Sequence, residues 1–376
     1  MRHLLLVILL LTSISVHSET IKIGLFHHLN VKVAHITLNS GSYEVYSNDA
    51  LVGTMKMGEK STISYQSGAV QMTSINLNIS SSSKLEFLAL ENNCELSISP
   101  KGHSLKRKIT GHLNFWNRGK KMSIINTQDL DVYISGVVEA EAGSQQNAEY
   151  YKVQAVICRT YALANKFKHA KSGFHLCDEV HCQVYKGVSN SNPDIISSTI
   201  ATSDVVVVNQ DVNLITTAFH SNCGGHTINS EDVWSRAVSY LKAVPDTFCL
   251  NMPHTDWERE VNKVHWMGFF REKGVSNILD SLDKFSNTNR TVYFADKIHL
   301  KDVRSEFRLR STLFTAKENG ETITVQGKGF GHGVGLCQEG AMKMSTLGYD
   351  YMSILHYYFS DIHVVPLSNF HLFQEN

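Results

Sequence analysis

The first hundred residues after the N-terminal segment show strand-like alternation and no helical period of any length. Residues 20–25, 43–46 and 85–90 alternate apolar with polar side chains, and a serine cluster at 80–83 marks one of the turns between them. A period of two residues is typical of strands with one buried face. We therefore predict a β-rich N-terminal domain over residues 19–115, and we find no chemistry in it.

The pattern changes near residue 130. Residues 130–138 form an apolar run, which we predict as a strand that leads into Glu139 and Glu141. Residues 148–166 repeat apolar side chains at helical spacing, which predicts a helix with a buried stripe. The stripe consists of Val153, Val156, Ile157, Thr160 and Ala164.

The rest of the chain alternates between short strands and helices. We predict strands near 204–208, 214–220 and 321–326, and helices near 257–273, 338–346 and 351–358. The fold class expected is α+β, with a β-rich N-terminal region followed by a mixed α/β core over residues 116–365 and a tail over 366–376. The hydrophobic content of 42% is enough for a packed core.

Residues 1–18 resemble a secretory signal peptide. They begin Met1-Arg2-His3, continue with an apolar run over residues 4–11, and end in small and polar residues. This run is shorter than the roughly 20 residues that a membrane helix needs, and no later stretch is long enough. We expect export to the periplasm, cell envelope or medium, with no membrane span after cleavage; an uncleaved anchor is the alternative.

The charge balance excludes a broad attraction to polyanions. Lysine plus arginine and aspartate plus glutamate each total 35. A chain without net charge has no general field for nucleic acid or an anionic membrane. We therefore expect no nucleic-acid partner, and a substrate recognised by local contacts.

Glu141 is the first candidate for chemistry. An acidic residue after an apolar strand, with a helix behind it, can be partly buried, and burial raises a carboxyl pKa so that it holds a proton for a leaving group. Arg159 on the following helix could orient that carboxyl or bind a substituent of a sugar. The alternative is that these glutamates lie near a helix start because the helix dipole favours them there.

A loop over residues 169–187 is rich in cysteine and histidine. His169, Cys177 and Cys182 are candidate ligands of a structural zinc ion, since zinc in proteins is bound by thiolates and imidazoles. The alternatives are a local disulfide between Cys177 and Cys182, or two thiols in a surface loop. We expect no other cofactor, and none that the reaction requires.

Two glycine-containing segments follow. In residues 221–227, Cys223 is predicted to form a disulfide with Cys249; the alternative is a nucleophile beside His220 or His226. Residues 327–335 alternate glycine with other residues but match neither nucleotide-loop pattern. Such alternation indicates close approach of another backbone or a ligand. His332 lies at its centre, and Cys337 is a conceivable catalytic partner.

Taken together, four blocks over residues 130–360 resemble the sporulation stage II protein D family, and they occur in that family's order. The first block contains Val137-Val138 and Glu141, then Gln154-Ala155-Val156 and Arg159-Thr160-Tyr161-Ala162. The other blocks are His181-Cys182-Gln183-Val184-Tyr185, Cys223-Gly224-Gly225-His226-Thr227 with Val244-Pro245-Asp246, and Gly331-His332-Gly333-Val334-Gly335-Leu336 with Gln338, Gly340 and Ala341.

This resemblance implies an activity on peptidoglycan. The family includes lytic transglycosylases that cut glycan strands stripped of stem peptides, and members described as enhancers of a cell-wall amidase. It implies that Glu141 is the catalytic acid and Arg159 its supporting residue. The substrate-binding residues that it implies are Gln154, Tyr161, His181, Gln183, Tyr185, His226 and His332.

We therefore predict a peptidoglycan lytic transglycosylase that cleaves the MurNAc–GlcNAc linkage and forms a 1,6-anhydro ring. Many relatives carry proline where this chain has Glu139, so a second carboxylate stands beside Glu141. In an extended strand the two side chains would lie on the same side. A hydrolase mechanism, which uses a pair of carboxylates, therefore stays an open alternative. The other hypotheses are a non-catalytic enhancer that binds glycan and partners an amidase, and a cysteine-dependent amidase or peptidase.

Overall fold

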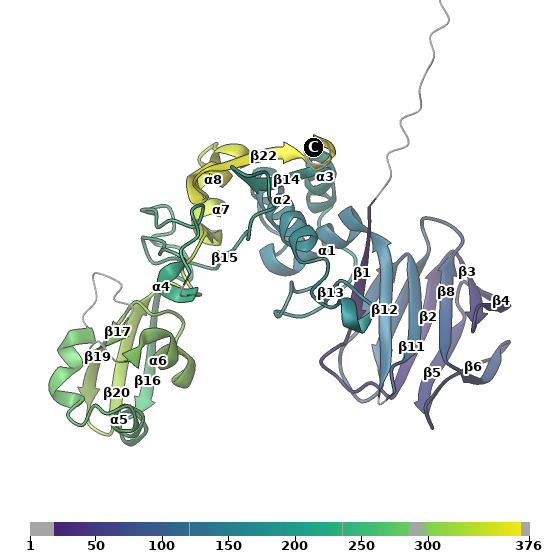
Figure 1. Cartoon of the computed structure of the whole chain (residues 1–376), viewed down its shortest axis with the longest axis horizontal. Coiled ribbons are helices and arrows are strands. Elements are labelled where there is room, and N and C mark those ends of the chain that lie inside the picture. The colour runs from purple at the N-terminus through teal and green to yellow at the C-terminus, as the bar shows by residue number, and fades with distance from the viewer. Residues whose placement is uncertain (1–18, 120, 235, 286–292, 295–297, 370–376) are drawn as a thin grey trace, which may run out of the picture.

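The computed structural model describes residues 19–119, 121–234, 236–285, 293–294 and 298–369. Figure 1 shows β-sheets of the N-terminal region at one end, a helical part in the middle and a small α/β unit at the other end. The expected α+β class is confirmed. In the described part of the chain, no helix combines the length and apolar character needed to cross a membrane. The predicted signal peptide lies outside the described residues.

The N-terminal region consists of two sheets, which are antiparallel except for the parallel pairing of β13 with β1 at the edge of one of them. One has the order β13-β1-β12-β11-β8-β3-β4 and the other the order β10-β9-β2-β5-β6-β7. The strands from this region are β1 Thr20–Leu25, β2 Val33–Ser40, β3 Ser42–Ser47, β4 Ala50–Lys56, β5 Lys60–Gln66, β6 Ala69–Ser74, β7 Asn78–Ser82, β8 Lys84–Ala89, β9 Glu95–Pro100, β10 Arg107–Thr110, β11 His112–Asn117 and β12 Met122–Asp129. The β-rich region therefore continues past residue 115, because β12 pairs with both β1 and β11.

Residues 130–138 are helical, so the predicted strand is wrong. They belong to α1 (Leu130–Ala142), which begins where the Asp129 carboxylate accepts a hydrogen bond from the Val132 amide at 3.0 Å. Helix α1 is buried by α2 (Ala148–Ala164) and α3 (Pro193–Ala201). A short apolar run is compatible with either a strand or a buried helix, and here the N-terminal cap and the helical neighbours favour the helix.

Helix α2 confirms the predicted helix and runs through the middle of the protein (Figure 1). Residues 153–160 are all buried, so this helix has no wide solvent face. Ala164 is exposed, contrary to the predicted stripe, because it belongs to the last turn. A single hydrophobic core extends from the N-terminal sheets through these helices.

The segments that follow α3 include β14, α7 and α8, which pack against helix α2. Strand β14 (Val205–Asn209) pairs with β22 (Ile362–Pro366), so Pro366 belongs to a strand rather than to the predicted tail. The predicted strand at 214–220 is reduced to β15 (Phe219–His220), which pairs in parallel with β21 (Leu336–Cys337). The remaining elements are η1 Ala170–Ser172, β13 Leu176–Cys177, α4 Glu231–Trp234, α7 Gln338–Thr346 and α8 Tyr351–Tyr358; the last two helices were predicted.

A small unit with its own hydrophobic core is inserted between these segments. Its sheet has the order β16-β20-β19, and the predicted helix at 257–273 divides into strand β16 and helix α5. The elements are β16 Asp256–Asn262, α5 Lys263–Glu272, η2 Leu279–Phe285, β17 Tyr293–Phe294, β18 Ile298–His299, α6 Leu300–Glu306, β19 Phe314–Asn319 and β20 Thr322–Lys328. Sequence analysis predicted strand β20 but not a separate unit.

Candidate functional site

A groove of about 350 Å³ lies beside the C-terminal end of α1. Six segments of the chain form it: the end of α1, helix α2, the cysteine-histidine loop, the segment that leads into β15, helix α4 and the glycine-rich loop. Its lining residues are Glu141, Tyr161, Val180, Cys182, Gln183, Thr216, Thr217, Ala218, Phe219, Trp234 and His332.

Glu141 is the acid of this groove. Its side chain is partly buried in the last turn of α1, and its Oε1 atom accepts a hydrogen bond from the Val184 amide at 3.0 Å. Burial raises the pKa of Glu141, and the Val184 hydrogen bond and the positive charge of Lys186 oppose that rise without cancelling it. The result is a carboxyl group that favours the protonated form more than an ordinary glutamate does.

Glu139 faces a different cavity. Residues two positions apart on an α-helix are separated by about 200° around its axis. Glu139 and Glu141 therefore point in nearly opposite directions. The Glu139 carboxylate accepts hydrogen bonds from the Ser189 hydroxyl at 2.6 Å and the Asn190 amide at 3.0 Å. Burial acts to raise the pKa of Glu139, but these hydrogen bonds outweigh it and the net shift is downward. The expectation that both carboxylates share one side is wrong, because the backbone here is helical.

Three of the predicted substrate-binding residues line the groove: Tyr161, Gln183 and His332. Gln183 is held in place by two groups, since its amide donates to the Cys158 carbonyl at 3.2 Å and its oxygen accepts from the Tyr133 hydroxyl. The His332 ring lies 5.5 Å from the ring of Trp234, measured between centroids.

Trp234 was missed by sequence analysis. Its side chain is 42% exposed and lines the groove. An exposed tryptophan offers a flat apolar surface with one hydrogen-bond donor, which suits the face of a sugar ring. The sequence signal that could have found it is a tryptophan two residues after the acidic pair Glu231 and Asp232, between the two glycine-containing segments.

Arg159 does not contact Glu141, and its predicted supporting role is corrected. Its guanidinium is 1% exposed and forms a 2.6 Å ion pair with Asp131 at the opposite end of α1. It also donates to the carbonyls of Thr199 and Val205. These partners belong to α1, α3 and β14, so Arg159 joins three elements of the core.

Three further predicted binding residues also lie elsewhere. Gln154 is fully buried and donates to the Tyr150 hydroxyl at 2.9 Å. Tyr185 is fully buried, accepts from Gln128 at 2.8 Å, and packs where a side chain on Gly136 would collide with it. His226 is exposed but does not line the groove. Burial inside the protein prevents the first two from reaching a substrate.

Four residues of the cysteine-histidine loop gather next to the groove. The ligand atoms of His169, Cys177, His181 and Cys182 all lie within 4.8 Å of one another. The Cys182 sulfur is 3.4 Å from His169 Nε2 and 3.7 Å from His181 Nδ1. Tetrahedral zinc with ordinary bond lengths places sulfur and nitrogen ligands about 3.5 Å apart. The donor set therefore fits zinc, and His181, which was predicted to bind substrate, lies in this cluster as its fourth donor.

This cluster is attached to the N-terminal sheet. Strand β13, which contains Cys177, pairs in parallel with β1 at its edge. Next to it, the buried Asp178 carboxylate accepts from the Phe26 amide at 3.0 Å and lies 3.4 Å from the Arg107 guanidinium. The N-terminal region, in which we predicted no chemistry, therefore positions the loop that carries Gln183 and Val184.

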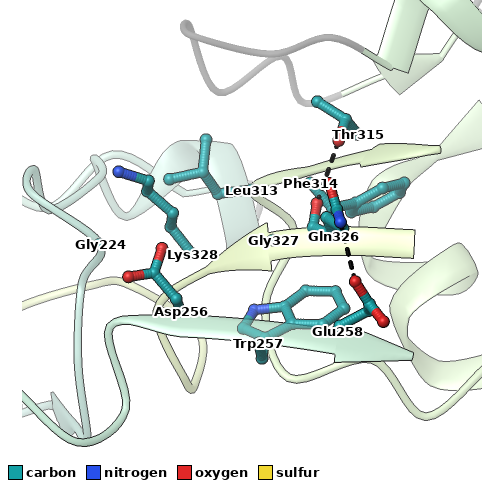
Figure 2. Close-up of a pocket in the computed structure, with 10 residues that line it drawn as sticks. All are labelled: Gly224, Asp256, Trp257, Glu258, Leu313, Phe314, Thr315, Gln326, Gly327 and Lys328. Carbon is teal, nitrogen blue, oxygen red and sulfur yellow. Dashed lines mark hydrogen bonds between the residues drawn. The ribbon is translucent and has the colours of Figure 1, made fainter. Parts of the chain in front are cut away.

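A larger cavity, of about 760 Å³, lies on the inserted unit (Figure 2). Residues of strands β16 and β20 line it, among them Trp257, and Gln326 donates to Glu258 at 2.8 Å. Its carboxylates, Asp256 and Glu258, are both exposed on strand β16. We place the chemistry in the smaller groove because a general acid needs partial burial to stay protonated, which Glu141 has and these two do not.

Comparison with known proteins now identifies the family. The family model described as Stage II sporulation protein matches residues 118–209, which include Glu141 and the whole cysteine-histidine cluster. An uncharacterized protein of Brachyspira hyodysenteriae is 31% identical over 266 residues, covering 68% of this chain and 72% of the relative. The chain belongs to the stage II sporulation protein D family.

Two further relatives of this chain have descriptive names. Stage II sporulation protein D of Bacillus amyloliquefaciens is 29% identical over 264 residues, covering 64% of this chain and 75% of the relative. A protein of Bacillus subtilis named amidase enhancer is 27% identical over 285 residues, which cover 60% of this chain and 39% of the relative.

Proposed function

We propose that this stage II sporulation protein D family member is an exported lytic transglycosylase that cleaves MurNAc–GlcNAc linkages in peptidoglycan glycan strands. One observation carries the proposal: Glu141 is a partly buried carboxyl group with a raised pKa in the wall of an open groove. Among the described lining residues of that groove it is the one carboxylate. Export stays a proposal, since residues 1–18 lie outside the described residues.

A single carboxyl group is sufficient for this reaction. Protonated Glu141 donates its proton to the glycosidic oxygen, and the bond to the MurNAc anomeric carbon breaks. The Glu141 carboxylate then takes the proton of the MurNAc C6 hydroxyl as that oxygen attacks the same carbon and closes the 1,6-anhydro ring. A hydrolase would need a second carboxylate to activate water, and Glu139 faces another cavity.

The groove also offers surfaces for sugar rings. Trp234 and His332 stand together on one wall, and Tyr161 and Gln183 line another part. Aromatic faces and a few fixed amide and hydroxyl groups are the usual means of binding uncharged sugars, since they give area and orientation without strong charges. This lining suits the faces and hydroxyl groups of the sugar rings in a glycan strand.

The alternative is a glycan-binding enhancer of a cell-wall amidase, and the name of the Bacillus subtilis relative supports it. The two functions differ in what the purified protein does alone. We expect soluble fragments from stripped glycan without any amidase. Release only when an amidase and intact stem peptides are both present would favour the enhancer and reject the transglycosylase.

The cysteine-dependent amidase is not retained as a proposal. Cys223 and Cys337 are both fully buried, so neither sulfur can reach a substrate. The thiol that lines the groove is Cys182, and its closest histidines, His169 and His181, are the other members of the candidate zinc site.

We expect cleavage to fall as pH rises through the raised pKa of Glu141, because the reaction begins with the protonated acid. Lys186 lowers this pKa by its charge. Replacing Lys186 with glutamine should therefore move the alkaline limb of the pH–rate profile to higher pH, with a larger displacement at low ionic strength. Lys317→Gln, on exposed β19, is the matched control and should leave the limb in place. A displacement to lower pH would contradict the assignment of the limb to Glu141.

We further propose that His169, Cys177, His181 and Cys182 hold a structural zinc ion. When bound, zinc would fix the loop that supplies Val184 to the Glu141 carboxylate. We expect Cys177→Ser to lose about one equivalent of zinc per chain and to melt at lower temperature. Cys94→Ser, a buried cysteine outside this cluster, should keep its full metal content. Equal zinc content in the two variants would reject this site.

A further inference from the structure

A second group of ligands lies in the core, away from the groove surface. It consists of Cys223, Asp246, Cys249 and Cys337, each of which is fully buried. Their ligand atoms all lie within 4.8 Å of one another. Three separate segments supply them: the loop after β15, residues 246–249, and the last residue of β21.

Their spacing is that of metal ligands rather than of a disulfide. The sulfurs of Cys223 and Cys249 are 3.4 Å apart, whereas a disulfide bond measures about 2.05 Å, so the predicted disulfide is wrong for this structure. The Cys223 sulfur is 3.2 Å from Asp246 Oδ2. Tetrahedral zinc places two sulfurs about 3.8 Å apart and a sulfur and a carboxylate oxygen about 3.5 Å apart. The observed separations are within a few tenths of an ångström of both values.

From this arrangement we propose a second, structural zinc site formed by three thiolates and one carboxylate. Thiolates and carboxylates carry negative charge, and burying such charge is costly unless a cation accompanies it. The Asp246 carboxylate accepts from the Tyr358 hydroxyl, the Cys249 amide and the Cys223 thiol, none of which is cationic. A divalent cation at the centre of the four would supply the missing positive charge.

The surroundings hold the ligands as zinc sites require. The Cys223 amide donates to the Cys337 sulfur at 3.2 Å, and the Tyr358 hydroxyl donates to Asp246 Oδ2 at 2.9 Å. Such hydrogen bonds orient the ligands and offset the charge on sulfur and oxygen. Gly340 lies so close that a side chain there would collide with Asp246 and Tyr358. The pocket therefore closes around the four ligands without space for a larger residue.

The site would stabilise one wall of the groove. Cys223 follows β15, and the groove residues Ala218 and Phe219 come directly before and within that strand. Cys337 precedes Gln338, whose side chain donates to the Glu141 carbonyl at 3.4 Å. A zinc ion that joins these segments would fix the groove wall and the end of α1, whether the groove cleaves glycan or only binds it.

Metal analysis of the full chain, purified without added reductant, tests this proposal. We expect native mass spectrometry to find two zinc ions per wild-type molecule. Cys249→Ser and Asp246→Asn should each lose one zinc ion and keep the other, whereas Cys177→Ser should lose the other and keep this one. Cys158→Ser, a buried cysteine outside both clusters, is the matched control and should keep two.

Two outcomes reject the proposal even if the Cys249 and Asp246 variants do not fold. A single zinc ion that Cys177→Ser releases would overturn it, as would a wild-type mass two hydrogens lighter that maps to a Cys223–Cys249 disulfide. If the wild type holds one zinc ion, and this ion is absent from Cys249→Ser but present in Cys177→Ser, the second site is supported and the first is rejected. Replacing zinc with cobalt gives an independent reading, since cobalt bound by three thiolates absorbs more strongly through sulfur-to-metal charge transfer than cobalt bound by two.

Discussion

Replacing Glu141 with glutamine will lower the rate of glycan cleavage by about 10²- to 10⁴-fold, the usual contribution of a general acid. Glutamine keeps the shape of the side chain, and its Oε1 atom can still accept the hydrogen bond from the Val184 amide. What it loses is the transferable proton. We therefore expect the variant to fold as the wild type does and to bind stripped glycan with similar affinity, with the loss confined to the catalytic rate.

Glu139→Gln is the matched control, since it makes the same chemical change two residues away. Glu139 faces a separate cavity, and a glutamine there can still accept from Ser189 and Asn190. We expect its cleavage rate to stay close to that of the wild type. If Glu139→Gln lost as much activity as Glu141→Gln, the two carboxylates would have to act together and the single-acid mechanism would be wrong.

Replacing Arg159 with methionine will destabilise the protein by about 3 kcal/mol, the lower part of the range for breaking a buried ion pair. The lower value is appropriate because the Asp131 side chain is 25% exposed and can be partly solvated once its partner is gone. The carbonyls of Thr199 and Val205 also lose a donor. Urea unfolding of the two proteins measures the difference directly.

Activity separates this structural role from a catalytic one. We expect the folded fraction of Arg159→Met to keep a near wild-type cleavage rate and an unchanged pH–rate profile. The double variant with Asp131→Leu should be less destabilised than the sum of the two single changes, because each removes the same interaction. Unchanged stability together with a large loss of cleavage would show instead that Arg159 acts on the substrate.

The sequence predicted the elements whose periodicity is unambiguous. Helix α2 was predicted because its apolar residues recur at helical spacing over several turns. Residues 130–138 failed because a continuous apolar run has no period, and its helical state depends on packing against α2 and α3. That error carried over to the site, since a helix turns Glu139 and Glu141 apart where a strand would keep them together.

The candidate site was only partly predictable for a related reason. A family motif mixes residues that contact substrate with residues that hold the core, and a sequence does not show which are buried. Glu141 and His332 reach the groove, while Arg159 and Tyr185 are enclosed by the helices and the sheet. The buried thiol cluster was harder still, because Cys337 joins Cys223 only through the parallel pairing of β21 with β15.

Digestion of stripped glycan in water enriched in heavy oxygen, followed by mass spectrometry, tests the central claim most directly. A transglycosylase uses the C6 hydroxyl of its own substrate, so no oxygen from water enters the product. We expect fragments that end in 1,6-anhydro-MurNAc, lighter than ordinary ends by one water molecule and without heavy oxygen, and we expect Glu141→Gln to produce almost none. Ordinary reducing ends that carry heavy oxygen would show hydrolysis and contradict the mechanism proposed for Glu141.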